Sequence, residues 1–306
     1  MTLRTCFTTI LPALCAASMA SAGMAQDQDG AITVDLEVFG GRSVVPPDII
    51  ENDIDQERLE GVIGGDFVVT YREGDTRIFV GAGAEAFPTD NLLNRYAFGL
   101  GGSQDIPIAQ GGRIRLRLGG AYDHVRGDQG RVFDRARADA QMIARHGGGH
   151  SSLGRIRYGY RDQSEERFTG FDQSEWLGEL RHTYRIPGTQ TSISGALLAL
   201  DVDAEDDRFS FQGLGFRVIG RVPLGNEWLG FGRVSYFNRD YEDPFNAAFP
   251  IARQDDVWRI SGGLERPLTD TLSGFAELGY IDHGSNIPVR DFSGLLGRVG
   301  VRMRLR

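Results

Sequence analysis

Arginine recurs at every second position in several stretches of this sequence. Between residues 113 and 118 three arginines alternate with Ile114, Leu116 and Leu118, and a similar alternation returns at 155–161 and at 297–306. A guanidinium group stays charged and offers several donors in a fixed fork, so it holds carboxylates, phosphates and other anions and does not form covalent bonds. The spacing therefore indicates anion-attracting surfaces more than a catalytic centre.

An element with a period of two residues must position these arginines. The C-terminal segment Leu295–Arg306 shows the period most clearly, with Val299, Val301, Met303 and Leu305 interleaved with arginines. Successive side chains of a β-strand point to opposite faces, so this segment has one apolar and one cationic face. On a helix the arginines would be spread around the cylinder, without a single apolar stripe.

The same alternation continues along most of residues 26–306. The whole chain contains 42 glycines and has a mildly polar mean hydropathy of −0.27. We therefore predict an all-β fold: a closed antiparallel transmembrane β-barrel of about fourteen strands, within about twelve to sixteen. Apolar side chains would face lipid and polar ones the lumen. A soluble β-sandwich or β-solenoid is the rival fold, but no fixed repeat is apparent.

Residues 1–25 are typical of a cleaved signal peptide. Arg4 precedes an apolar run that ends in small residues, with Gly23 and Ala25 before the expected cut. Both cysteines, Cys6 and Cys15, lie in this segment, so the remainder offers no disulfide and no thiolate. A signal peptide followed by a barrel predicts export through the inner membrane to the outer membrane of a Gram-negative bacterium.

Composition and motifs exclude several function classes. The net charge is −9, and this acidic balance argues against a nucleic-acid partner, which needs a basic surface. His124, His182 and His283 have no nucleophile motif around them, so we expect no enzyme and no cofactor. His146 and His150 flank three glycines and lack a third ligand in sequence, so we expect no metal site.

Connections alternate between short and long. Short turns are expected near Gly74, Gly148, Pro187, Pro223 and Pro267, and longer or more acidic segments near Pro46, Asp128, Glu165, Asp206, Pro244 and Ser285. Short periplasmic turns and longer external loops would give this pattern, with both termini periplasmic. Gly40–Gly61, Val125–Arg131 and Tyr241–Arg253 are predicted as loops, the first either a solvated acidic loop or a lid folded into the pore.

Three further features depend on the barrel. Phe133–Arg145 is predicted as a strand, with a helix as the rival because of its alanines. The acidic stretch 201–207 is predicted as a solvated tip, because it lacks the glycine and closing glutamate of a calcium loop. Aromatic residues near strand ends are expected to form interfacial girdles; they are Tyr122, Trp176, Tyr184, Trp228, Trp258 and Tyr280.

The lumen would then be rich in arginine. The predicted pore-lining residues are Arg113, Arg115, Arg117, Arg135, Arg137, Arg155, Arg157, Arg161, Arg181, Arg233, Arg298, Arg302, Glu179, Glu265 and Glu277, with Asp139 as a further inward acid. Two interpretations remain open at this point. The arginines could set a field that favours anionic solutes, or they could form a lattice of ion pairs that braces the wall.

The C-terminal part resembles a known family. Arg253–Asp256, Leu264–Thr269, Tyr280–Pro288, Asp291-Phe292 and the final arginine-rich strand resemble the barrel of surface lipoprotein assembly modifiers and of other porin-like outer-membrane barrels. This resemblance implies a barrel that assists export or surface display of a partner protein or lipoprotein.

The sequence therefore predicts first a passive diffusion pore for small, anionic solutes, with export or display of a client as the alternative. An outer-membrane enzyme is the least favoured. Expected partners are outer-membrane lipid and lipopolysaccharide, the barrel-assembly machinery, and either small anionic solutes or an exported client, but no nucleic acid.

Overall fold

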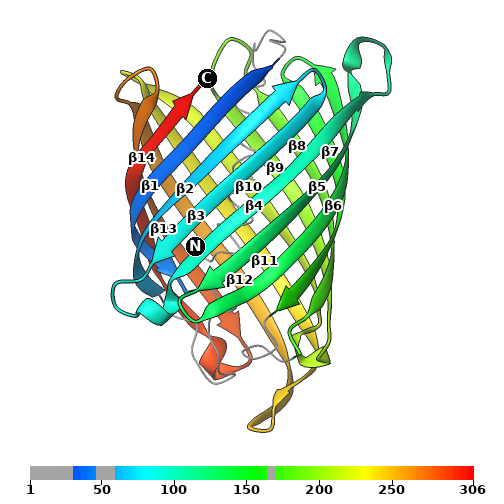
Figure 1. Cartoon of the computed structure of the whole chain (residues 1–306), viewed down its shortest axis with the longest axis vertical. Coiled ribbons are helices and arrows are strands. Elements are labelled where there is room, and N and C mark those ends of the chain that lie inside the picture. Colours follow the sequence, from blue (N-terminus) through cyan, green and yellow to red (C-terminus); the bar gives the residue numbers. More distant parts are fainter. Residues whose placement is uncertain (1–29, 46–58, 164–169) are drawn as a thin grey trace.

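The structure is a computed structural model, and it describes residues 30–45, 59–163 and 170–306 (Figure 1). In these residues fourteen strands close into one antiparallel barrel. The predicted all-β closed barrel of about fourteen strands is confirmed. The predicted signal peptide, residues 1–25, lies outside the described residues.

The strands follow one another around the wall in chain order. They are β1 (Ala31–Val44), β2 (Leu59–Glu73), β3 (Thr76–Ala86), β4 (Arg95–Pro107), β5 (Ile114–Gly127), β6 (Gly130–Gly147), β7 (His150–Gln163), β8 (Gln173–Arg185), β9 (Ser192–Ala204), β10 (Phe211–Gly225), β11 (Trp228–Asn246), β12 (Phe249–Pro267), β13 (Leu272–Ser285) and β14 (Phe292–Leu305). Short 3-10 helices lie in connections: η2 (Asn91–Leu93), η3 (Gln110–Gly112), η4 (Asp207–Phe209) and η5 (Pro288–Arg290). None of the helices in the described ranges has the length and apolar character needed to cross a membrane.

The first and last strands complete the wall. β1 pairs with β14 from Val34 opposite Leu305 to Arg42 opposite Gly297, so the C-terminal arginine-rich segment closes the cylinder. Closure matters because a free sheet edge in hydrocarbon would leave backbone N–H and C=O groups without partners.

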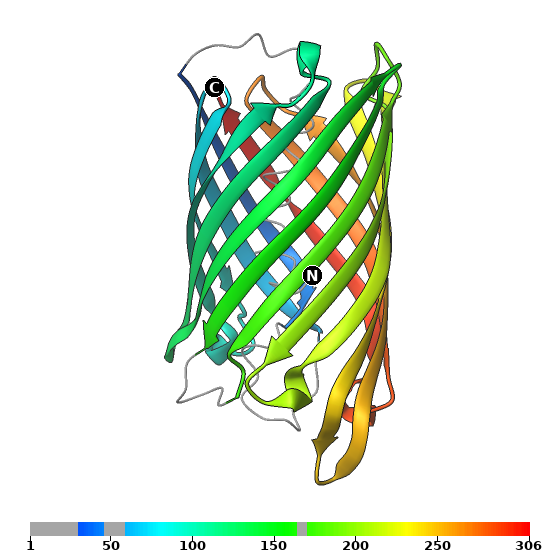
Figure 2. The same cartoon turned by 90° about the vertical axis from the view of Figure 1, so that its right-hand side faces the viewer.

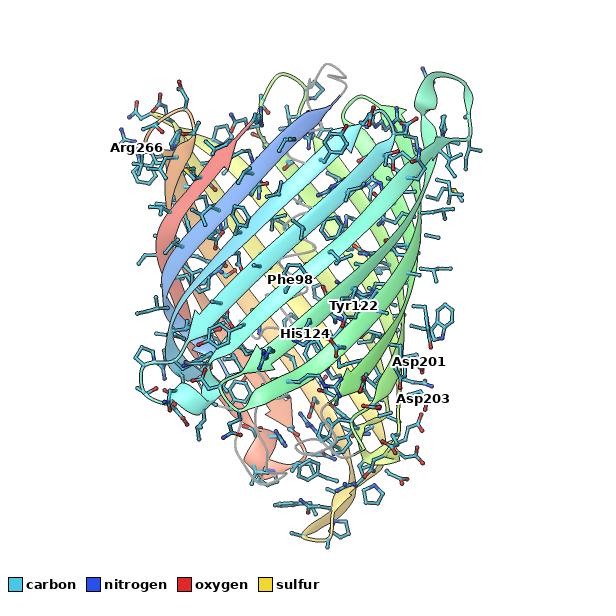
Figure 3. All side chains as sticks on the ribbon, viewed as in Figure 1. Phe98, Tyr122, His124, Asp201, Asp203 and Arg266 are labelled. Carbon is cyan, nitrogen blue, oxygen red and sulfur yellow. The ribbon has the colours of Figure 1, made fainter. Side chains whose placement is uncertain are left out.

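Side chains alternate between the two faces of the wall as the sequence predicts. On β14, Leu295 and Val299 point outward with 57% and 62% of their surface exposed, whereas Leu296 is buried inside. Figure 3 shows Phe98 and Tyr122 on the outside of the front wall, and both are exposed. Charged side chains that are buried lie on the opposite, inner face. This asymmetry is the pattern of a barrel with an apolar exterior.

The two ends of the barrel differ. The beginning of β1 and the end of β14 lie at the end with short turns, at the top of Figure 1. The helices η2, η4 and η5 lie in connections at the other end, which we call the loop end. The predicted girdle residues divide between them: Tyr184 and Trp228 lie at the short-turn end, and Tyr122, Trp176, Trp258 and Tyr280 lie toward the loop end.

Three predicted loops need correction. β5 and β6 meet at Gly127 and Gly130, so Val125–Arg131 is a tight hairpin with strand on both sides. Tyr241–Arg253 is mostly strand as well, because β11 and β12 stay paired up to Asn246 and Phe249 and project beyond the rest of the rim (Figure 2). Polar residues there mimic a loop because that part of the hairpin lies beyond the apolar band. Within Gly40–Gly61, β1 extends to Val44 and β2 begins at Leu59, so only the two ends of this prediction are corrected. Residues 46–58, and with them the choice between a solvated loop and a lid, lie outside the described residues.

Candidate functional site: the charged inner wall

The predicted inward arginines lie on the inner face, with one exception. Arg135, Arg137, Arg157 and Arg161 are each less than a tenth exposed, as buried charges of the inner wall. Arg113 instead lies before β5, exposed in the turn after η3, because Gly111 and Gly112 adopt positive φ there and the strand begins only at Ile114. The prediction from the period-two pattern was therefore wrong for Arg113, because it started the strand one residue too early.

Most of these arginines face carboxylates. Asp123 of β5, which is fully buried, contacts Arg135 at 3.2 Å and Arg137 at 2.6 Å. Glu175 of β8 contacts Arg157 at 3.2 Å. Further contacts join Arg117 to Asp105, Arg155 to Asp139, and Arg181 to Glu179. We call this set the β5–β8 lattice. Asp123, Glu175 and Glu179 are buried, whereas Asp139 and Asp105, the latter on the neighbouring β4, are half-buried. All of them compensate positive charges that would otherwise be costly to bury.

A second set of ion pairs crosses the closure of the barrel. Arg298 contacts Glu37 at 3.5 Å and Glu277 at 3.2 Å. Arg302 contacts Glu37 at 2.6 Å and Glu265 at 3.0 Å. Glu37 on β1 thus bridges two arginines on β14, while the other two acids tie β14 to β13 and β12. The predicted inward glutamates are all brought into contact with arginines.

Glycine allows inner-wall phenylalanines to lie flat. A Cβ on Gly215 would lie 2.4 Å from Phe237 Cδ2, and one on Gly300 would lie 2.9 Å from Phe275 Cζ. The rings therefore occupy the space that a side chain on the neighbouring strand would fill. Arg302 lies over the Phe275 ring at 4.1 Å from its centroid, within range of a cation–π interaction. Each such stack keeps an aromatic ring against the wall.

One sector of the wall carries arginine without close compensation. β10 presents Arg217 and Arg221 inward, and β11 presents Arg233 and Arg239. Arg217 is 3.7 Å from Glu179, and Arg239 is 4.0 Å from Asp255. In the described ranges, neither Arg221 nor Arg233 has a carboxylate oxygen within 4.0 Å, the distance expected for an ion pair. Their electrostatic partners are Glu265 for Arg221 and Glu277 for Arg233, both at longer range. We call these four residues the β10–β11 arginines.

The β10–β11 arginines were only partly predicted. Sequence reasoning included Arg233 but missed Arg217, Arg221 and Arg239, although all four follow the same period-two pattern. The register of β10 and β11 would have placed them on the inner face, but a register is not visible in one sequence.

The histidines form a cluster that the sequence did not reveal. His150 Nδ1 lies 3.2 Å from His182 Nε2, and the Ser152 hydroxyl lies 3.0 Å from His182 Nδ1 and 2.8 Å from His146 Nε2. Strand pairing at the short-turn end brings β6, β7 and β8 together here. Among the described residues, no group of three or more His, Cys, Asp or Glu is arranged to hold a metal ion. The hydrogen bonds among these exposed side chains account for the cluster.

The other two histidines each face an aspartate. His124 points outward, as Figure 3 shows, with Nδ1 2.7 Å from Asp134. His283 is buried inside, with Nε2 3.3 Å from Asp255. In both cases the carboxylate can orient the imidazole ring.

The acidic stretch 201–207 is divided between strand and loop. Asp201 and Asp203 point outward from β9 at the loop end (Figure 3). Asp206 caps η4 by accepting a hydrogen bond from the Arg208 N–H, and its carboxylate pairs with the Arg208 side chain at 2.6 Å. The side-chain hydrogen bond from Arg208 lowers the pKa of Asp206 below its ordinary value.

The fold and the charged inner wall define a class: the chain is a closed antiparallel β-barrel of fourteen strands with an apolar outer face and a charged inner face. The scan against protein-family models matched no family, and the search of curated proteins found no match.

Among solved structures the chain is similar to OmpTdeltaL8, a loop deletion mutant of an outer membrane protein of Vibrio cholerae. The identity is 10% and the TM-score 0.50, over 91% of this chain and 100% of that chain. An anion-selective porin from Comamonas acidovorans has 10% identity and a TM-score of 0.46, covering 90% and 100% of the two chains. Omp33 of Acinetobacter baumannii has 13% identity and a TM-score of 0.43, over 92% of this chain and 100% of that chain. At these identities the likeness shows the fold alone, and the resemblance to surface lipoprotein assembly modifiers is not shown.

Proposed function

We propose that this barrel is a passive diffusion pore in the outer membrane of a Gram-negative bacterium and that it favours small anionic solutes. The observation that carries the proposal is the β10–β11 sector, where four arginines point inward and no carboxylate on either strand, within the paired wall between Phe211 and Tyr241, points inward beside them. Positive side chains that line a water-filled passage raise the local concentration of anions and exclude cations.

The two sequence-based interpretations of the arginines then apply to different sectors. The β5–β8 lattice braces the wall, because its acids sit within ion-pair distance of its arginines. The β10–β11 arginines supply the field, because their compensation is loose or distant. In this proposal Arg115 and Arg157, which contact Asp75 and Glu175, contribute less to selectivity than Arg221 and Arg233.

Planar-bilayer recording of the purified, refolded chain tests this proposal. A salt gradient across the bilayer should give a reversal potential that shows preference for chloride over potassium. One unit charge at ~5 Å in water-like surroundings contributes about 0.8 kcal/mol, so Arg221→Ser or Arg233→Ser should each lower the chloride preference by up to about fourfold.

Arg266→Ser is the matched control. Arg266 lies at the short-turn end (Figure 3), where its guanidinium stacks on Trp228 at 5.5 Å from the ring centroid. Arg266→Ser removes one positive charge, as the test variants do, but away from the β10–β11 arginines. The chloride preference of this variant should therefore equal that of the unchanged chain. A barrel that carries no current, or one whose preference survives the double variant Arg221→Ser/Arg233→Ser, would refute the proposal.

Export or display of a client protein is the second candidate. The hairpin of β11 and β12 favours it, because it projects beyond the rim (Figure 2) and presents Ile251 with 49% of its surface exposed. A sealed barrel in the recording would remove the pore and leave this candidate. The pore proposal requires no catalysis, no cofactor and no nucleic acid, and its partners are the lipid and lipopolysaccharide around the outer wall and the machinery that assembles barrels.

A further inference from the structure

The inner face of β9 carries no charged side chain. Its inward residues run from Ser192 through Leu198 and Leu200 to Val202 and Ala204, while Asp201 and Asp203 point outward. Leu200 lies opposite Leu177 of β8, another inward apolar residue. For the inner wall of a barrel that holds water this is unusual, since such walls are polar.

An aromatic ring extends the apolar surface across β10. Leu198 and Leu200 pair with Gly215 and Gly213 on that strand, which have no side chains. The Phe237 ring from β11 covers both glycines, with its atoms 2.4 to 2.5 Å from where their Cβ atoms would be. We call Leu177, Leu198, Leu200 and Phe237 the inner apolar patch.

Charged side chains border this patch. Buried Glu179 of β8 lies opposite Leu198 and 3.7 Å from Arg217, whereas the charged neighbours on β10 and β11 are arginines. Arg217 is two residues along β10 from Gly215 and lies opposite Ala196, diagonal to Leu198. Arg239 lies 5.9 Å from the centroid of Phe237, and Arg233 lies opposite Ile219. A cationic border beside an apolar surface is complementary to a molecule with one anionic end and an apolar body.

We propose that the inner apolar patch and the arginines beside it form a binding site for organic monoanions with a short apolar body, such as medium-chain carboxylates. The carboxylate pairs with Arg217 and Arg233, and the hydrocarbon lies over Leu198, Leu200 and Phe237. The inference rests on the proposed pore and names the class of solute that the pore selects.

The patch differs from the buried clusters of the inner wall. Phe39, Val62, Phe87, Leu93 and Phe275 pack into a cluster in which each is less than a tenth exposed. The four residues of the patch are half-buried, and none of them belongs to the buried clusters of the described ranges. Half-exposed apolar side chains gathered beside charge mark a binding surface more than a packed core.

Block of the chloride current by carboxylates of increasing length tests the inference. Acetate, butyrate and hexanoate carry the same charge and differ only in hydrocarbon. Partial burial of four additional methylene groups should give hexanoate a half-blocking concentration at least about tenfold below that of acetate. The recording uses the full refolded chain and symmetric chloride on both sides.

Paired leucine substitutions locate the site. In Leu198→Ala/Leu200→Ala the half-blocking concentrations of hexanoate and acetate should lie within about twofold of each other, because the apolar contact is lost. The chloride preference should not change, because neither leucine carries charge. Leu197→Ala, on the same strand with its side chain outward and 63% exposed, should leave the tenfold ratio intact. The single variant Leu200→Ala, and the length series on the unchanged chain, provide the test if the double variant does not fold.

The outcomes separate the two proposals. Equal block by acetate and hexanoate through a chloride-selective pore overturns this inference and leaves the pore. A length-dependent block that survives Leu198→Ala/Leu200→Ala also overturns it, because the hydrocarbon then binds elsewhere. A chain that conducts no current overturns both proposals together.

Discussion

Replacing Asp123 by asparagine tests whether the β5–β8 lattice braces the barrel. Its carboxylate is fully buried and lies 2.6 Å from Arg137 and 3.2 Å from Arg135. Asp123→Asn keeps the shape but removes the charge, leaving two buried guanidinium groups without this counterion. Breaking a buried ion pair from one side costs about 3–5 kcal/mol. Because Glu175 still lies 3.9 Å from Arg135, we expect the lower end, about 3 kcal/mol.

Urea unfolding of the refolded barrel, followed by tryptophan fluorescence, measures this change. Asp203→Asn is the matched control, because Asp203 points outward from β9 and is exposed (Figure 3). The control should alter the free energy of unfolding by no more than about 0.5 kcal/mol. If Asp123→Asn changes it by less than about 1 kcal/mol, water in the lumen must screen these charges. The assignment of the lattice to stability would then be wrong.

The remaining predictions concern packing and pH. Gly215→Ala should destabilise the barrel by about 1–3 kcal/mol in the same urea assay, because its Cβ would lie 2.4 Å from both the Tyr236 carbonyl oxygen and the Phe237 ring. Gly220→Ala, on the same strand with no atom within 4 Å of its Cβ, should be neutral or slightly stabilising, and equal effects would contradict the packing. Since the pKa of Asp206 is lowered from 3.8, its contact with Arg208 should stabilise η4 fully above that pH and be lost as pH falls through the lowered value. Hydrogen exchange of the loop between β9 and β10 measures this, and protection that first disappears near pH 6 would refute it.

Period-two alternation was enough to predict most of the fold, because one face of each strand meets lipid. The facing of β14 followed directly from its apolar and cationic sets. Alternation does not reveal which face of β9 points inward, because Leu197 faces out and Leu198 faces in, so both faces are apolar in the middle of the strand. The hairpin 241–253 was misjudged because strands beyond the apolar band carry polar residues on both faces.

The candidate site was predictable in composition but not in its pairing. The sequence could name Arg135 and Arg137 as inward, but not that Asp123 lies between them, because the contact depends on the register of β5 and β6. The same limit hid the approach of His182 to His150, which are 32 residues apart. Contacts between strands require a register, and one sequence does not reveal it.

In the proposed pore, selectivity depends less on how many arginines line the wall than on how closely carboxylates neutralise each of them. Where Glu37 bridges Arg298 and Arg302, the charges nearly cancel and the contact fastens β1 to β14. Arg221 and Arg233 lie beyond ion-pair distance from Glu265 and Glu277, so in the proposed pore their positive charge is the part that acts on solutes. In the proposed pore, an entering anion meets this field along β10 and β11, beside the apolar surface of β9. Selectivity for charge and selectivity for hydrocarbon then arise on the same side of the wall, so substitutions on β9 and on β10–β11 should separate them.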